Sequence, residues 1–142
     1  MGRLLFGFSG RLPRLRYFVP SLVAEIIFVG AAFVLAVRIY AAGVQIAWPT
    51  LIACALLLVL VGIVILSLTV RRLHDLDLSG WWVLPIWIVP SAIEGGMALL
   101  ADNPQLGSSL SGALGLVISL FLWLAPGTRG ANRFGPDPRR AG

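Results

Sequence analysis

The sequence has no lysine, a single histidine and a single cysteine among its 142 residues. One histidine with scattered aspartates supplies neither a HExxH motif nor three zinc ligands, so the residues predict no catalytic set, no metal and no cofactor. Cys54 has no second cysteine with which to form an internal disulfide and is expected to pack as a small hydrophobic residue. Because lysine is absent, every full positive charge is a planar guanidinium that suits phosphate and carboxylate oxygens.

Charged residues are also scarce. They make up 12% of the chain against an ordinary share of about 25%, whereas hydrophobic residues make up 58% against about 45–50%. The mean hydropathy is +0.93, and no charged residue occurs from Ile39 to Val70. This composition indicates an integral membrane protein with room for one domain.

The excess of basic residues gives a sequence pI of about 11.1, which in a soluble protein would suggest nucleic-acid binding. Here the eleven arginines stand just outside the apolar runs. Such a basic fringe orients membrane spans and contacts anionic lipid headgroups. We therefore expect membrane lipids as partners and no nucleic acid.

The apolar runs predict an all-α fold, a polytopic transmembrane helical bundle with four spans that forms a single membrane domain over residues 1–142. A helix needs about 20 residues to cross the hydrocarbon core. The expected spans cover approximately residues 17–37, 49–70, 81–100 and 107–125. Residues 1–16 are expected to lie at the headgroup level, and residues 126–142 to form an irregular tail rich in proline and glycine.

Prolines and a serine refine these boundaries. Pro20 and Pro49 are expected in the first turns of the first two spans, where a missing N–H costs little. Ser79 is expected to cap the third helix. Pro90 lies in the middle of the third run and is expected to kink or break that helix. This leaves an alternative with three spans, in which residues 81–100 re-enter the membrane and return.

The arginines predict how the chain is threaded. If the first segment, the loop at 71–80 and the tail share one side of the membrane, that side carries ten arginines. Four of them belong to the first segment, two to the loop and four to the tail. The other side carries only Arg38. Because cytoplasmic loops are enriched in positive charge, we expect a multi-pass protein of the bacterial cytoplasmic (inner) membrane with the N-terminus and the C-terminus both cytoplasmic.

A dense polar segment, Arg71-Arg72-Leu73-His74-Asp75, separates the second run from the third. If the second helix continues past the membrane, Arg71 and Arg72 can each pair with Asp75, and His74 can meet Asp77 or a group of the tail. The candidate polar residues at this interface are Arg11, Arg14, Arg71, Arg72, His74, Asp75, Asn132, Arg133 and Asp137.

Two interpretations of these residues stay open. In the first, they form a structural clamp, in which arginines bind carboxylates and phosphates and close a helical hairpin. In the second, they bind a lipid headgroup or another anion, with Arg71, Arg72 and Arg133 contacting phosphate while His74 and Asp75 orient them.

Two acidic residues, Glu25 and Glu94, lie inside apolar runs, where such residues are functional hypotheses by default. Their distances from the expected helix starts, ~12 Å and ~20 Å at ~1.5 Å per residue, place them in different leaflets. An unpaired carboxylate at that depth is costly, so we expect Glu25 to pair with Arg71 or Arg72. A role in a proton path is the alternative.

Small residues recur every four positions along the fourth run. Gly107, Ser111, Gly115 and Ser119 therefore share one helix face. In lipid, such a stripe lets another helix backbone come close, so we expect this face to serve contact with a partner membrane protein or a second copy of the chain.

Three blocks of the sequence resemble a known family. They are Phe6-x-Phe8-x-Gly10-Arg11-x-x-Arg14-x-x-Tyr17, Arg71-Arg72-Leu73-His74-Asp75-x-x-x-Ser79-Gly80-Trp81-Trp82, and Pro126-Gly127-Thr128-x-Gly130-x-Asn132-Arg133-Phe134-Gly135-Pro136-Asp137-Pro138. In this order they are similar to the bacterial inner-membrane family catalogued as domain of unknown function 805. The resemblance implies a small multi-span membrane protein and no established activity. The chain departs from the family pattern at Phe18 and at Asp77-Leu78, and residues 91–125 are longer than usual.

The sequence thus supports two classes of function. The first is a non-enzymatic module that binds anionic lipid headgroups or a partner membrane protein at the cytoplasmic face. The second is a small oligomeric transporter or channel that uses Glu25 or Glu94. A transporter is expected to place a carboxylate in a polar cavity joined to solvent, whereas a lipid or scaffold module is expected to keep it dry and paired with arginine.

Overall fold

The computed structural model describes residues 6–42 and 48–138. The outer ends of the expected segments 1–16 and 126–142, with Arg3, Arg139 and Arg140, lie outside the described residues. In chain order the elements are α2 (Arg14–Ala42), α3 (Trp48–Asp75), the short 3-10 helix η1 (Gly80–Trp82), α4 (Val83–Leu100) and α5 (Pro104–Leu124).

Among the described residues, four helical segments are long and apolar enough to cross a membrane: Arg14–Tyr40, Trp48–Asp75, Gly80–Leu100 and Pro104–Leu124. This confirms the all-α, four-span prediction. The alternative with a re-entrant third segment is wrong, because η1 and α4 run on without interruption from Gly80 to Leu100. Pro90 does not break α4. Proline is tolerated inside transmembrane helices because small local adjustments satisfy the backbone group that it leaves unpaired.

The helix starts differ in part from the prediction. Helix α2 already begins at Arg14, so Pro20 lies in its second turn rather than its first. Pro49 is the second residue of α3, as expected. Ser79 caps η1 by accepting a hydrogen bond from the N–H of Trp81 at 3.4 Å. Helix α5 begins at Pro104, earlier than predicted, because Asn103 caps it by accepting from the N–H of Leu106.

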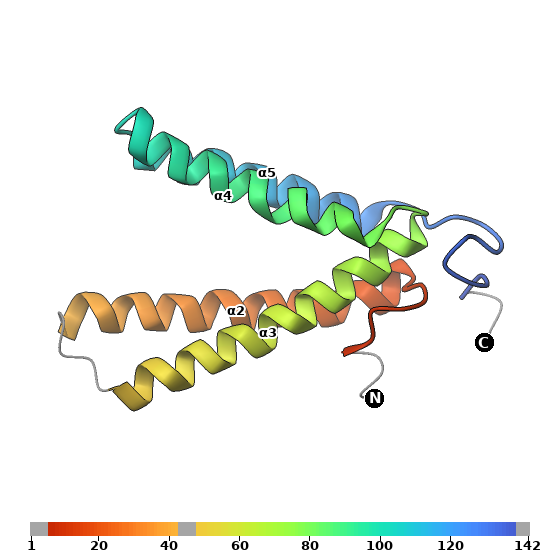
Figure 1. Cartoon of the computed structure of the whole chain (residues 1–142), viewed down its shortest axis with the longest axis horizontal. Helices are drawn as coiled ribbons and strands as arrows, with labels where there is room; N and C mark the ends of the chain where they lie inside the picture. Colours follow the sequence, from red (N-terminus) through yellow and green to blue (C-terminus); the bar gives the residue numbers. More distant parts are fainter. Residues whose placement is uncertain (1–5, 43–47, 139–142) are drawn as a thin grey trace.

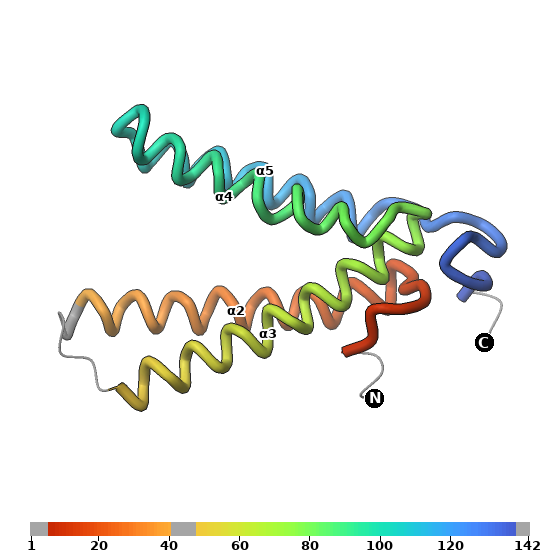
Figure 2. The backbone as a smooth tube through the Cα atoms, in the orientation of Figure 1, coloured from red at the N-terminus to blue at the C-terminus, as the bar shows by residue number. Residues whose placement is uncertain are grey.

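The helices form two antiparallel hairpins, α2 with α3 and α4 with α5 (Figure 1). The hairpins converge at the end where both termini lie and diverge toward the other end, as the backbone trace shows (Figure 2). The buried apolar core is at the converging end and consists of Leu12, Tyr17, Leu68, Leu73, Val83 and Leu122. The remaining helix faces are largely exposed apolar surface, which suits contact with lipid.

One notable contact lies between the two hairpins, and another lies within the second hairpin. Between the hairpins, the indole N–H of Trp123 donates to the buried hydroxyl of Ser21 at 3.0 Å, and its ring meets Phe18 edge-on. Within the second hairpin, a Cβ built on Gly107 would lie 2.9 Å from both the carbonyl oxygen of Glu94 and Cβ of Met97. Only glycine therefore permits the close approach of α5 to α4 at this level.

Candidate functional site

At the converging end, one carboxylate joins three distant parts of the chain. Asp75 is buried at the last residue of α3 and lies between two buried arginines, Arg11 and Arg72. Arg11 Nε donates to Oδ1 at 3.1 Å, and Arg72 Nη1 donates to Oδ2 at 2.8 Å. We call Arg11, Arg72 and Asp75 the polar cluster. Two positive charges and one negative charge away from water are stable only when their hydrogen-bonding groups are satisfied.

Arg11 connects the polar cluster to the tail. Its Nη1 donates to the carbonyl oxygen of Gly130 at 2.6 Å, and its Nη2 donates to the carbonyl of Thr128 at 2.5 Å and to the hydroxyl of Thr128 at 3.0 Å. A guanidinium has five N–H donors in one plane, so one side chain can hold both the carboxylate and the loop. This explains why the irregular tail has a defined path.

Arg72 connects the polar cluster to the end of α5. Its Nε donates to the carbonyl of Leu122 at 2.7 Å, and its Nη2 donates to the carbonyl of Ala125. The last carbonyls of a helix have no partner within the helix and carry partial negative charge. Arg72 supplies both the missing donor and the complementary charge.

Further hydrogen bonds attach the tail to α3. The N–H and the hydroxyl of Thr128 both donate to the carbonyl of Asp75, at 2.8 Å and 3.0 Å. The amide of Asn132 donates to the carbonyl of His74 at 2.9 Å, and Asp137 accepts from the N–H of Gly130 at 3.0 Å. Apart from one isolated bridge between Asn132 and Gly135, the described tail has no regular element, as predicted.

His74 meets a tail group rather than Asp77. Its ring stacks on Phe134 with ring centroids 3.9 Å apart and planes 8° apart. Its Nδ1 lies 3.2 Å from the carbonyl oxygen of Gly10. Since a carbonyl oxygen only accepts, Nδ1 carries the proton, and Nε2 of the neutral ring is then an acceptor.

The three arginines expected to contact phosphate have different surroundings. Arg72 is fully buried and engaged with Asp75 and α5, so the expectation that it binds an external phosphate is wrong. Arg133 is exposed, forms an ion pair with Asp77 at 3.4 Å and donates to its backbone carbonyl. Arg71 is half-buried, and its carbonyl accepts from the N–H of Leu12.

A cleft of about 520 Å³ opens beside the polar cluster. It lies between the start of α2 and the loop after α5, and Asp75 contributes to its wall. Three exposed arginines line it: Arg14, Arg16 and Arg129. In the part of the chain that the structure describes, none of these three side chains forms a hydrogen bond or an ion pair. Of these three, only Arg14 is a candidate from the sequence, because Arg16 and Arg129 belong to segments whose meeting depends on the path of the tail.

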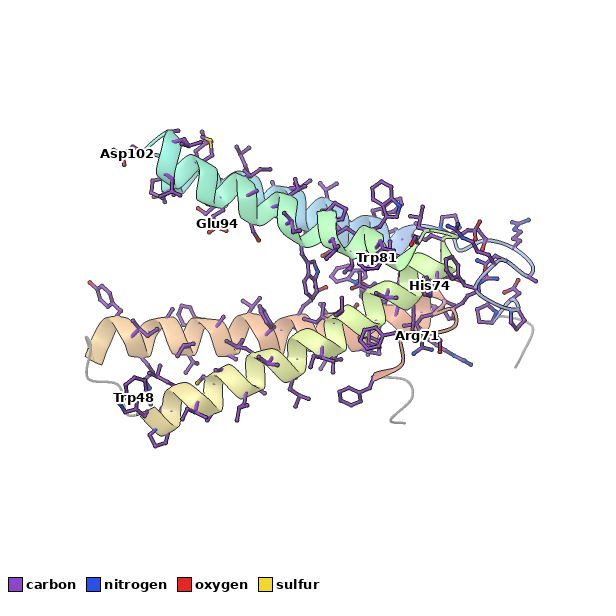
Figure 3. All side chains as sticks on the ribbon, in the orientation of Figure 1. Trp48, Arg71, His74, Trp81, Glu94 and Asp102 are labelled. Atoms are coloured by element: carbon purple, nitrogen blue, oxygen red, sulfur yellow. The ribbon has the colours of Figure 1, made fainter. Side chains whose placement is uncertain are left out.

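Neither intramembrane acid forms an ion pair with the polar cluster in the described part of the chain. Figure 3 shows Glu94 on α4, well away from Arg71 and His74. Glu94 accepts a long hydrogen bond of 3.5 Å from the hydroxyl of Ser111. Within residues 6–42 and 48–138, Glu25 forms no ion pair, so the expected pairing with Arg71 or Arg72 is wrong. Arg72 cannot reach out to Glu25 because Asp75 and α5 already hold it.

Glu25 lines a groove of about 570 Å³ on α2. The other residues that line this groove are apolar or glycine: Leu22, Ile26, Val29, Gly30 and Phe33. Glu25 thus faces an apolar groove and has no arginine partner among the described residues. The described residues also contain no group of three potential metal ligands.

The small-residue face of α5 is used in part inside the chain. Gly107 packs against Glu94 and Met97 of α4, and Ser111 contacts the Glu94 carboxylate. Gly115, in contrast, has open space where a side chain would be. The α4 helix thus already covers the first half of the stripe.

Comparisons with known proteins agree with this architecture. The chain is 30% identical over 133 residues to "Inner membrane protein YhaI" of Escherichia coli (strain K12), which covers 94% of this chain and 86% of the relative. It is 33% identical over 133 residues to "Inner membrane protein YhaH" of the same organism, covering 94% and 88%. No solved structure matches the chain.

The matching family model, described as "Protein of unknown function (DUF805)", covers residues 5–136 and therefore includes every member of the polar cluster. The described part of the chain has four helices long and apolar enough to cross a membrane, and its relatives are bacterial inner-membrane proteins. It is an integral membrane protein and belongs to the DUF805 family.

Proposed function

We propose that this protein is a non-enzymatic membrane module that binds anionic lipid headgroups at the cytoplasmic face of the inner membrane. The observation that carries the proposal is the cleft lined by Arg14, Arg16 and Arg129. The polar cluster, in this proposal, is the scaffold that holds the cleft open and is not itself the binding group. The proposal places the headgroup on Arg14, Arg16 and Arg129, whereas the sequence predicted that Arg71, Arg72 and Arg133 contact the phosphate.

The availability of the three arginines supports this division. Arg11 and Arg72 use their donors on Asp75 and on backbone carbonyls, so they have little capacity for a ligand. The arginines of the cleft are exposed, and none has an acidic partner in the described part of the chain. Guanidinium groups bind phosphate oxygens through paired, charge-assisted hydrogen bonds.

The local charge also favours an anion. Asp75 is the single acidic residue among those that line the cleft, and it is already placed between two arginines. The like charges of Arg14, Arg16 and Arg129 line one cleft and repel one another. A phosphate in the cleft would reduce that repulsion.

The position of the cleft relative to the predicted bilayer suits a lipid headgroup. Arg14 and Arg16 belong to the first turn of α2, and Arg129 follows the last residue of α5 by five positions. The start of α2 and the end of α5 therefore lie at the same side of the predicted bilayer. Arginine clusters next to the cytoplasmic ends of spans are attracted to anionic lipids of that leaflet.

Native mass spectrometry of the purified protein in mixed phosphatidylglycerol and phosphatidylcholine micelles tests the proposal. We expect retained phosphatidylglycerol in the wild type and about a hundredfold loss when Arg14, Arg16 and Arg129 are all changed to Gln, because each of the three charges near the surface contributes about 1 kcal/mol. Arg38→Gln, at the opposite end of α2, is the matched control and is expected to retain the lipid. Equal retention of the two lipids, or an unchanged triple variant, would overturn the proposal.

The proposed orientation has its own test. In a Cys54→Ser background, single cysteines at Ser79 and at the C-terminus are expected to be inaccessible to a membrane-impermeant maleimide in intact cells. A cysteine in place of Asp102, at the far end of α4, is expected to react. Labelling of Ser79 and not of Asp102 would overturn the cytoplasmic placement.

A further inference from the structure

A second groove, separate from the arginine cleft, lies beside the last turns of α3 and the start of α4. It has a volume of about 420 Å³ and combines aromatic side chains with one imidazole and one hydroxyl. The aromatic walls come from Phe8, Trp81 and Phe134, and the polar groups are His74 and Ser79. The groove shares no lining residue with the arginine cleft.

The imidazole presents a defined acceptor to this groove. The contact of Nδ1 with the Gly10 carbonyl assigns the proton to Nδ1, so the lone pair of neutral His74 is on Nε2. Nε2 has no hydrogen-bond partner among the described residues, and it is not among their buried unpaired atoms, so it is accessible at the surface. The stacking on Phe134 fixes the plane of the ring and hence the direction of this lone pair.

Gly80, in the turn after α3, leaves Nε2 of His74 accessible from the groove. A Cβ at residue 80 would lie 3.3 Å from Nε2 of His74 and 2.9 Å from Cγ1 of Val70, so glycine there leaves the space in front of the imidazole free. Ser79, which precedes Gly80 in the sequence, also lines the groove. The Ser79 oxygen accepts from the N–H of Trp81, which leaves the hydroxyl proton available as a donor.

We propose that this groove binds a membrane-soluble phenolic ring, a phenol or a hydroquinone, through its hydroxyl group. A phenolic O–H donates to Nε2 of His74 while its oxygen accepts from Ser79, so one hydroxyl satisfies both groups. The ring packs against Phe8 and Trp81, since aromatic pairs are favoured beyond the area that they bury. The turn lies at the ends of α3 and α4, which places it at the level where amphiphilic rings collect.

The single histidine of the chain provides a specific readout. In ¹⁵N-histidine-labelled protein in phosphatidylcholine nanodiscs at about pH 8, where an ordinary imidazole is neutral, 4-pentylphenol is expected to shift the Nε2 resonance saturably. Its methyl ether, which lacks the O–H, is expected to bind about tenfold more weakly, as for the loss of one neutral hydrogen bond. Pentylhydroquinone is expected to behave like the phenol, and hexanol to bind several-fold more weakly because it lacks the ring.

Three variants locate the binding in this groove. Gly80→Ala is expected to abolish the shift by filling the space before Nε2, and Ser79→Ala to weaken binding. His74→Phe, which keeps the stacking on Phe134, is expected to lose retention of the phenol over protein-free nanodiscs. The triple Arg→Gln variant of the cleft is expected to bind the phenol normally. Equal effects of the phenol and its ether, an equal effect of hexanol, or full retention by His74→Phe would overturn the inference.

Discussion

The carboxylate of Asp75 lies directly against the backbone of Gly127: a Cβ built at residue 127 would overlap Oδ2 and stand 2.6 Å from Cγ of Asp75. The same carboxylate accepts from Arg11 and from Arg72. The N-terminal segment, the end of α3 and the loop after α5 therefore meet at one residue. The stability of the whole converging end is expected to depend on this point.

Gly127→Ala is expected to destabilise the protein by about 1–3 kcal/mol, because the added methyl group forces the carboxylate or the loop to move. Thermal unfolding in detergent measures the change. Gly112→Ala on α5 is the control, since a Cβ there meets nothing within 4 Å and alanine favours a helix. Equal midpoints for Gly127→Ala and wild type would contradict the close contact.

Asp75→Asn is expected to cost about 3–5 kcal/mol, since it leaves two buried guanidinium groups without a counter-charge. Asp77→Asn removes an acid from the same turn but breaks only the exposed pair with Arg133, so it is expected to cost at most about 1 kcal/mol. Denaturant titration in a mild detergent compares the two. A similar small loss for both variants would show that the polar cluster contributes little.

Arg11→Ala is expected to release the tail, because Arg11 donates to Thr128 and Gly130 across more than a hundred residues of sequence. Limited trypsin digestion followed by peptide mass analysis is expected to show faster cleavage after Arg129 and Arg133. Arg16→Ala, which removes an exposed arginine of the same segment, is the control and should leave the cleavage rate at these sites unchanged.

Gly107→Ala is expected to loosen the α4–α5 hairpin, because the new Cβ lies within 3 Å of backbone and side-chain atoms of α4. The expected loss is about 1–3 kcal/mol. Gly115→Ala, on the same face of α5, meets open space and is expected to be neutral. The unfolding midpoints of the pair in detergent provide the measurement, and a neutral Gly107→Ala would refute the tight crossing.

Glu25→Gln is expected to leave the stability in detergent unchanged or slightly raised, because the carboxylate has no cationic partner among the described residues. Its groove is otherwise apolar, and an uncharged amide costs less there than a charge. Unfolding midpoints of wild type and variant at neutral pH test this. A clear loss of stability would mean that Glu25 has an attractive partner after all.

The sequence alone determined the class of this protein and most of its secondary structure. Long apolar runs without charge form transmembrane helices in any tertiary arrangement, because the backbone must satisfy its own hydrogen bonds in lipid. The irregular tail and the caps at Ser79 and Asn103 are equally local in origin, and the structure shows all of them. The pairing of Arg72 with Asp75 could also be predicted from the sequence, since the two residues are three positions apart on one helix.

Which arginines are structural and which are available depends on contacts between distant parts of the chain. Arg11 and Arg16 are five residues apart and equally charged in the sequence, yet one is buried against Asp75 and the other faces the cleft. That difference depends on where the tail crosses α3, which is set by hydrogen bonds between residues more than fifty positions apart. The same holds for Glu25, whose expected arginine is held elsewhere by the end of α5. Long-range contacts of this kind leave no local pattern in the sequence, because either partner alone is compatible with many other neighbours.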